Sequence, residues 1–124
     1  MECSPIGTVR TPLTDPDDAP RQGQWDALEG RIELDSEYEE ALAGFDGDSV
    51  VVVWWADRAD RSVRSYERDG VRGVFTTRSP DRPNPVCLTT CEVLGVEDAA
   101  LSVRGVDMLD GTPVIDLKPP VVPE

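Results

Sequence analysis

The stretch SVVVVWWA, residues 49–56, decides the fold of this chain of 124 residues. It is continuously apolar, β-branched and aromatic, and it is too short for a buried helix of normal length. We therefore predict a central strand that is buried on both faces. Because adjacent side chains of a strand point to opposite faces, Trp54 and Trp55 cannot line the same pocket, and core packing is expected for at least one of them.

Five further segments on either side of this run have the short, β-rich pattern of strands. One short helix is also expected, because Ser36 and Glu39 have the spacing of a capping box and Gly44 can end the helix. Six strands without regular β-α-β alternation favour a closed or nearly closed barrel. We predict a mainly β protein, a single small β-barrel domain with one short helix over residues 1–124. The predicted strands are 5–11, 30–35, 49–56, 72–78, 86–97 and 100–108.

The chain is strongly acidic, with 25 Asp and Glu against 12 Lys and Arg and a net charge of −13. The carboxylates are spread along the chain, which is typical of a surface adapted to molar salt. An ordinary acidic domain is the alternative. No run of about 18 apolar residues and no signal peptide is present, so we expect a soluble, cytoplasmic protein without a membrane partner.

The ionisable residue types restrict the chemistry that the chain can perform. It has no histidine, which excludes Ser-His, Cys-His and His-metal mechanisms. Its three cysteines form no Cys-x-x-Cys pair, so we expect free thiols in a reducing compartment and no metal site. Cys87 and Cys91 are four residues apart on a predicted strand and should therefore share a face.

Positive charge is concentrated in one segment. Residues 58–82 hold seven arginines against four acids, a net charge of +3, whereas residues 1–57 hold three arginines against fourteen acids, a net charge of −11. A local arginine surface on an acidic protein suits phosphate binding at high salt, where specific bidentate contacts must contribute more. The alternative is a solvated arginine face that neighbouring acids neutralise.

The segment TRSPDRPNP, residues 77–85, contains three prolines that fix φ and restrict the residue before each of them. Such a loop is stiff and extended, and polar groups held on a stiff loop lose little entropy when a ligand binds. A rigid surface turn between strands is the alternative. The restricted pairs are Ser79–Pro80, Arg82–Pro83 and Asn84–Pro85.

A second group of polar residues lies in GVDMLDGTPVIDLKPP, residues 105–120, where three aspartates interrupt an apolar stretch. LDGTP is a tight turn in which Gly111 can adopt positive φ and Asp110 can bond nearby backbone amides. By itself this could be a hairpin turn. Beside the proline-framed loop, it is interpreted as the other wall of a site.

The two motifs together resemble the TrmO/TsaA family. GVFTTRSPDRPNPVCL (73–88) and VRGVDMLDGTPVIDLKPP (103–120) carry the resemblance, with weaker support from PIGTVRTP (5–12) and PRQGQ (20–24). The resemblance implies an S-adenosylmethionine-dependent methyltransferase built on a β-barrel. It also implies methylation of N6 of threonylcarbamoyladenosine at position 37 of tRNA, by dimers with the cofactor near the subunit boundary.

Residue roles follow from the resemblance, motif by motif. Arg82, Asn84 and Lys118 would face the reacting end of the cofactor or the tRNA. Arg82 or Lys118 would hold the threonyl carboxylate, while the arginine-rich segment 58–82 holds anticodon-loop phosphates. Trp25 is the aromatic residue expected near the ligand. The residues implied to line or close the cofactor pocket are Gln22, Gly23, Gln24, Asp57, Arg58, Arg78, Leu88, Leu109, Asp110, Gly111 and Thr112.

The chain departs from the family pattern before and after its apolar run. GDSVV (47–51) stands where the family has FSHLW, and Asp57 or Arg58 stands where it has a histidine. RSVRSYERDG (61–70) replaces RPPR, and Pro120 replaces a tyrosine. Two alternatives therefore stay open: a related methyltransferase with a different substrate, and a non-catalytic module that binds S-adenosylmethionine.

Methyl transfer from a sulfonium needs an aligned nucleophile and a dry approach more than it needs a strong base. The N6 proton of threonylcarbamoyladenosine lies between a purine and a carbonyl, which makes it more acidic than in adenosine. Solvent or a carboxylate could accept it. The absence of histidine is therefore compatible with this reaction.

Overall fold

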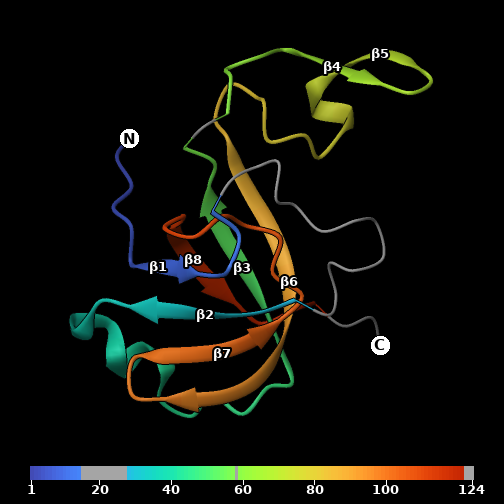
Figure 1. Cartoon of the computed structure of the whole chain (residues 1–124). Coiled ribbons are helices and arrows are strands. Elements are labelled where there is room, and N and C mark those ends of the chain that lie inside the picture. The colour runs from blue at the N-terminus through green and yellow to red at the C-terminus, as the bar shows by residue number, and fades with distance from the viewer. Residues whose placement is uncertain (15–27, 58, 122–124) are drawn as a thin grey trace.

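The computed structural model describes residues 1–14, 28–57 and 59–121. Six antiparallel strands form a closed barrel in the order β1-β2-β7-β6-β3-β8, and a two-stranded hairpin, β4-β5, projects from one end of it (Figure 1). This confirms the predicted mainly β barrel. The barrel strands are β1 (Gly7–Arg10), β2 (Glu29–Leu34), β3 (Ser49–Trp55), β6 (Val86–Glu97), β7 (Ala100–Arg104) and β8 (Pro113–Lys118); the hairpin strands are β4 (Arg64–Glu67) and β5 (Gly70–Gly73).

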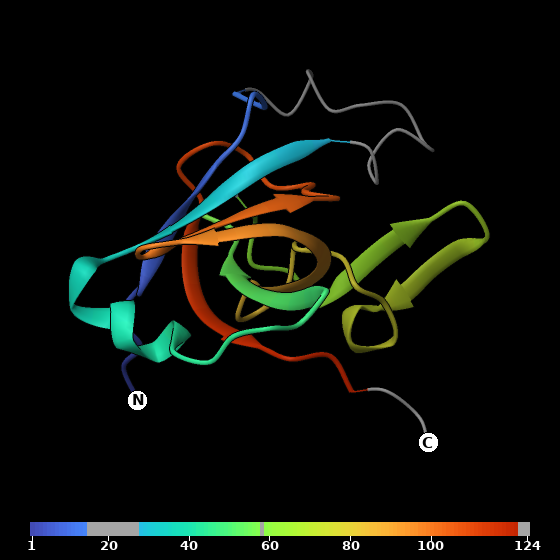
Figure 2. The same ribbon diagram turned by 90° about the horizontal axis from the view of Figure 1, so that it is seen from below.

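Strand β3 is central, as its apolar sequence predicted, and it pairs with β6 on one side and β8 on the other. Val50 and Val52 are completely buried inside the barrel, whereas Val51 is only half-buried. On the other face Val53 is buried, at 8% exposure, so the prediction of burial on both faces holds at Val53 but not at Val51, because alternate side chains of a closed barrel point outward. The view along the barrel in Figure 2 shows the strands wrapping around this interior. The buried core is Val9, Ile32, Leu34, Leu42, Val50, Val52, Cys91, Leu101, Val103, Val106, Met108 and Val114.

One of the six predicted strands is wrong, and one barrel strand was missed. The predicted strand 72–78 is divided between the end of β5 and a 3-10 helix, η4 (Val74–Thr76). The sixth barrel strand is β8, which pairs with β1 and β3 and closes the barrel. The EDA turn between β6 and β7 is confirmed, with Asp98 at a φ of 49°.

The predicted short helix is a 3-10 helix, η3 (Ser36–Leu42), and its capping differs from the prediction. Asp35 occupies the N-cap position, and no side chain caps the helix. The capping box of Ser36 and Glu39 was therefore wrong. Leu42 is the one buried residue of this segment, so no apolar stripe supports a longer α-helix. Gly44 does follow the helix, at a φ of 77°.

No helix in the three described ranges is long and apolar enough to cross a membrane.

Candidate functional site

The LDGT turn is fixed against the end of β1. The Asp110 amide donates to the Leu13 carbonyl at 2.6 Å, and the Gly111 amide donates to the Val9 carbonyl at 2.8 Å. The Asp110 carboxylate accepts from the Thr11 amide at 3.2 Å. Gly111 has a φ of 89°, as the turn sequence predicted. Residues far apart in sequence thus hold this turn at one mouth of the barrel.

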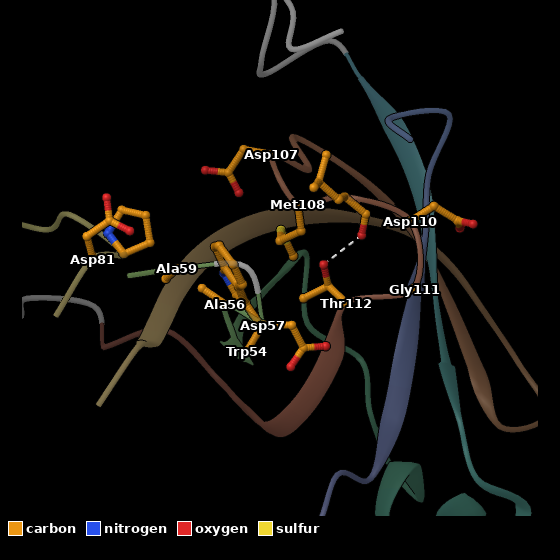
Figure 3. Close-up of a pocket in the computed structure, with 12 residues that line it drawn as sticks. Trp54, Ala56, Asp57, Ala59, Asp81, Asp107, Met108, Asp110, Gly111 and Thr112 are labelled. Atoms are coloured by element: carbon orange, nitrogen blue, oxygen red, sulfur yellow. Dashed lines mark hydrogen bonds between the residues drawn. The ribbon is translucent and has the colours of Figure 1, made fainter. Parts of the chain in front are cut away.

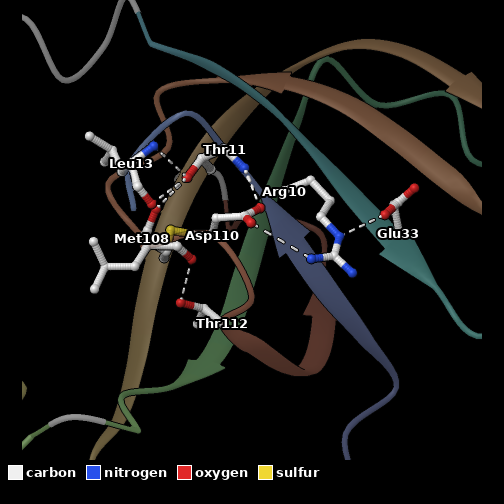
Figure 4. Close-up of polar contacts among 8 residues, drawn as sticks. Arg10, Thr11, Leu13, Glu33, Met108, Asp110 and Thr112 are labelled. Carbon is white, nitrogen blue, oxygen red and sulfur yellow. Dashed lines mark hydrogen bonds and ion pairs between the residues drawn. The ribbon is translucent and has the colours of Figure 1, made fainter. Parts of the chain in front are cut away.

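Polar contacts of its neighbours lock the turn further. The Asp110 carboxylate lies 3.8 Å from the Arg10 guanidinium, which also pairs with Glu33 at 3.0 Å (Figure 4). The Thr112 hydroxyl donates to the Leu109 carbonyl at 2.7 Å. The carboxylate of Asp110 is therefore used to hold the turn. The predicted bond to a nearby amide differs in its partner, because the amide is that of Thr11, 99 positions away.

A cavity of about 370 Å³ opens beside the turn, between it and the segment that follows β3 (Figure 3). Leu109, Asp110, Gly111 and Thr112 line it, together with Asp57. The structure therefore brings together five of the predicted cofactor-binding residues. We call it the acidic cavity, because its charged lining among the described residues is four aspartates: Asp57, Asp81, Asp107 and Asp110.

A second cavity, of about 620 Å³, lies between the proline-framed loop and the start of β6. Arg78, Arg82 and Leu88 line it, and we call it the arginine cavity. Trp54, Pro80 and Asp107 belong to the lining of both cavities. The two motifs that the sequence singled out thus face a pair of adjoining spaces of opposite charge.

A chain of hydrogen bonds crosses the wall that the two cavities share. The indole Nε1 of Trp54 donates to the Thr89 hydroxyl at 3.0 Å, and that hydroxyl donates to Asp107 Oδ1 at 2.7 Å. Trp54 lines both cavities, whereas Trp55 lines a different one. The prediction that the two indoles face different pockets is confirmed.

Arg82 is bonded to the backbone of its own loop. Its Nη1 donates to the carbonyls of Thr77 and Ser79, each at 3.1 Å, and its Nη2 donates to the Val74 carbonyl at 3.4 Å. Its guanidinium carbon lies 6.0 Å from the centre of the Phe75 ring. Arg82 therefore shapes the loop that carries Arg78, in addition to lining the arginine cavity.

The other two residues expected at the reacting end lie elsewhere. Asn84 is exposed and lines a third cavity, of about 780 Å³, with Trp55 and Asp57. Lys118 is opposite Val51 in the strand register and forms an ion pair with Asp116 at 3.1 Å. Six residues of extended chain separate Val51 from Asp57, which is roughly 20 Å. Within one chain, Lys118 is thus not brought together with the other predicted site residues.

Several predictions fall on residues outside those that the structure describes. They are Gln22, Gly23, Gln24 and Arg58, predicted to contact the cofactor, and Trp25, predicted to lie near the ligand.

All three cysteines are free, and Cys87 and Cys91 share the inward face of β6. Burial raises the pKa of the Cys91 thiol to about 12, and the charge of Asp107 acts in the same direction. Burial also raises the pKa of Cys87, although the neighbouring Arg82 guanidinium opposes this. Neither thiol is a thiolate at neutral pH, so carboxylates and cations carry the chemistry of the site.

Sequence reasoning missed Trp54, Thr89 and Asp107 as parts of the shared wall. Asp107 was noted as one of three aspartates in an apolar stretch, but its partner on β6 is 18 positions away. Thr89 lies two residues after Cys87 on β6, so both side chains face inward. A polar threonine on this inward face was the one sequence signal that could have indicated a partner for Asp107.

The fold and the paired cavities define a class: a small antiparallel β-barrel whose site is built by two stiff loops at one mouth. The sequence matches the family model of the tRNA-methyltransferase O N-terminal domain over residues 8–123. The chain belongs to this TrmO family.

Three similar proteins show how far the likeness extends. A probable S-adenosyl-L-methionine-binding protein of Halobacterium salinarum is 52% identical, over 96% of this chain and 98% of its own length. The crystal structure of TrmO from Pseudomonas aeruginosa superimposes with a TM-score of 0.82 and 34% identity, over 98% of this chain. This chain spans 56% of that crystallised chain. A mouse tRNA (adenine(37)-N6)-methyltransferase is 57% identical over 47 residues, which are 38% of this chain and 11% of the mouse protein.

Proposed function

We propose that this chain binds S-adenosylmethionine across the acidic and arginine cavities and transfers its methyl group to N6 of threonylcarbamoyladenosine at position 37 of tRNA. The observation that carries the proposal is the convergence of the two family motifs on adjoining cavities, in a chain that belongs to the TrmO family. The relatives' names, one for S-adenosylmethionine binding and one for methylation of adenine 37, support it. Cytoplasmic tRNA is the substrate that we propose.

The lining of the cavities fits the cofactor chemically. S-adenosylmethionine carries a positive sulfonium and an ammonium beside an apolar adenine, and it supplies an activated methyl group when bound. The acidic cavity offers carboxylates together with the half-buried Leu109 and the buried Met108. In the arginine cavity, Arg78 suits the carboxylate of S-adenosylmethionine, and Leu88 suits a planar apolar group such as its adenine. These residues would hold the donor and exclude water from its methyl group.

The threonyl carboxylate of the substrate requires a cation near the acceptor nitrogen. Arg82 lines the arginine cavity, and its three bonds to backbone carbonyls leave further guanidinium N–H groups for a ligand. Lys118, the other predicted partner, would have to come from a second chain, because it lies at the end of β8, opposite Val51 near the start of β3. Arg82 is therefore the cation that we propose for this carboxylate.

The anticodon loop has a candidate surface on the projecting hairpin. Arg64 and Arg68 are exposed, and neither forms an ion pair within the described ranges. Guanidinium groups without carboxylate partners remain available for bidentate phosphate contacts. We propose that these two arginines bind anticodon-loop phosphates, together with those of segment 58–82 that are not assigned to the cofactor or to the threonyl carboxylate.

A homodimer is proposed on the basis of the exposed apolar side chains of the same region. Val63, Tyr66, Val71 and Phe75 are 56–80% exposed, and Leu88 in the arginine cavity is 51% exposed. Apolar side chains gathered on one arm are typical of an interface, and a second copy is the partner that the family resemblance implies.

The test is transfer of labelled methyl from S-adenosylmethionine to tRNA with and without threonylcarbamoyladenosine at position 37. Molar KCl is included because of the acidic surface, and cofactor binding is measured in parallel. Label in the modified tRNA alone is the expected result. Cofactor binding without label in either tRNA would overturn the proposed reaction and favour a binding module, which the name of the Halobacterium relative would also fit.

A further inference from the structure

Asp107 occupies a distinctive position between the two cavities. Among the described residues, it is the one charged side chain that lines both the acidic cavity and the arginine cavity. Figure 3 shows its carboxylate beside Met108 at the edge of the acidic cavity. A ligand that occupies both spaces would therefore meet lining that includes this carboxylate.

The carboxylate is oriented by protein contacts but is not neutralised by them. Thr89, itself held by Trp54 Nε1, donates to Oδ1 of Asp107. Asp107 takes part in no ion pair, and its Oδ2 accepts no hydrogen bond, within the part of the chain that the structure describes. Its orientation is therefore set before a ligand arrives, while its negative charge remains available.

Two of the other aspartates around the acidic cavity are already used by the protein. Asp110 is shared between the Arg10 guanidinium and the Thr11 amide. Asp81 accepts a hydrogen bond from the Asp60 amide at 2.9 Å. Asp107 differs from Asp110 because its one hydrogen bond comes from a neutral hydroxyl and it has no ion pair among the described residues. It differs from Asp81 because it lines both cavities.

This arrangement suggests a role that rests on the proposed function. A methyl donor with a sulfonium carries a positive charge at the reacting centre, and the thioether product left after transfer does not. A carboxylate at the junction of the cavities favours the charged form and gives nothing to the neutral one. We propose that Asp107 is the specificity-determining residue that lets the site prefer S-adenosylmethionine over its product, S-adenosylhomocysteine.

The experiment compares both ligands with wild-type protein and with Asp107→Asn by calorimetry. The asparagine keeps the size of the side chain and can still accept from Thr89, so the change is the loss of charge. We expect the Kd of S-adenosylmethionine to rise about five-fold or more, which corresponds to about 1 kcal/mol for a charge pair in a water-like dielectric. The Kd of S-adenosylhomocysteine should change less than about two-fold, because an uncharged thioether replaces the sulfonium in that ligand.

Two further variants separate this effect from general ones. Asp46→Asn removes one negative charge from an exposed loop that lines none of the site cavities, and it should leave both dissociation constants unchanged. Thr89→Val removes the hydroxyl that orients Asp107 but keeps the charge. Its preference for the charged ligand should lie between those of the wild type and Asp107→Asn.

The remaining outcomes are distinguishable. Equal weakening of both ligands by Asp107→Asn would overturn the inference, because the residue would then be a charge-independent contact. Unchanged affinities with lower turnover would also overturn it and make Asp107 an acceptor for the N6 proton. If the wild type binds neither ligand, the proposed function itself fails, and that failure is visible before any variant is measured.

Discussion

The arginines of the barrel wall and those of the projecting segment, residues 59–85, have opposite surroundings. Arg10, Arg31 and Arg104 on the barrel each form ion pairs with glutamates of the barrel strands, at 3.0–3.7 Å. In the described part of the projecting segment, the one arginine with an ion pair is Arg72, which contacts Asp69. The difference indicates that the barrel arginines complete a surface, whereas Arg64, Arg68 and Arg78 of the segment form no ion pair with the described residues.

The two regions also differ in what holds them together. The barrel has a continuous apolar core, whereas the projecting segment buries little beyond Ser65, Val74 and Pro85. Polar contacts to backbone take the place of a core. One example is Arg61, whose guanidinium donates to the Pro83 carbonyl at 2.6 Å and lies 5.3 Å from the centre of the Trp55 ring. Segments held in this way open at lower free energy than a packed core does.

The largest expected effect tests whether the core alone sets global stability. Ile32 is completely buried in the barrel, so Ile32→Ala removes apolar contacts and leaves a cavity. We expect the free energy of unfolding to fall by about 2–5 kcal/mol. Val71→Ala on the hairpin, where the side chain is 56% exposed, is the control and should change it by less than about 0.5 kcal/mol. Urea titration measures both, and equal losses would contradict the division into two regions.

The second prediction concerns Arg82, whose guanidinium bonds hold the proline-framed loop in place of apolar packing. If Arg82 contacted the substrate alone, Arg82→Ala would lower turnover with cofactor affinity nearly intact, as the sequence by itself suggested. Its bonds to three carbonyls of the loop that carries Arg78 indicate a wider effect. We expect turnover to fall at least about ten-fold and cofactor affinity to fall with it.

Two measurements complete the test of Arg82. Hydrogen exchange of the amides at 74–79 should accelerate in Arg82→Ala, while the urea midpoint of the barrel stays nearly unchanged. Arg82→Lys keeps the charge but cannot reproduce the guanidinium fork, so it should resemble the alanine variant in exchange. Unaltered exchange and unaltered cofactor affinity in both variants would restore a purely substrate-binding role.

Cys91 and Cys87 give a third, smaller effect, because they lie on one face of β6 at different depths. Burial raises the folded-state pKa of Cys91 to about 12 from an ordinary value of 9.0. Stability from the buried neutral thiol is then fully present below pH 9 and is lost as the pH rises toward 12, since the unfolded thiol ionises first. Between pH 8 and pH 10, we expect wild type to lose about 1 kcal/mol more than Cys91→Ala does.

Cys87 is the internal comparison for this pH effect. The pKa of Cys87 is raised by burial but opposed by Arg82, and the residue lines the arginine cavity. Cys87→Ala should therefore retain most of the wild-type pH dependence. Identical pH profiles for wild type and Cys91→Ala, by urea titration at both pH values, would contradict the assignment to Cys91.

Local chemistry explains which parts of the fold could be predicted from sequence. The left-handed Gly111 turn, the position of β3 and the opposite faces of Trp54 and Trp55 each depend on a few adjacent residues. Strand β8 was missed because prolines frame it and Asp116 interrupts its apolar pattern. Its strand identity depends on pairing with β1, about a hundred positions away, where Gly7 lies opposite Val114.

Some features of the candidate site could likewise be predicted from the sequence, and others could not. The family resemblance implied that Leu109 to Thr112 and Arg78 line the cofactor pocket, and the structure places them on the lining of two adjoining cavities. The motifs could not show that Arg82 bonds carbonyls, since backbone acceptors carry no sequence signal. The Asp107 contact with Thr89 depends on how β6 lies beside the 105–112 segment, which the barrel closure decides.

The smallest expected effect on stability is at the tip of the projecting segment, where Tyr66 is 79% exposed. Tyr66→Ser removes an exposed ring, so the free energy of unfolding of the monomer should change by less than about 0.5 kcal/mol. If the proposed dimer buries this ring, the same change should raise the dimer dissociation constant about ten-fold or more in sedimentation velocity experiments. Leu94→Ser on the barrel, at 42% exposure, is the matched control and should leave the dissociation constant unchanged. Equal weakening by both substitutions would show that association follows total exposed apolar surface, and the contrast between barrel and projecting segment would then not extend to the interface.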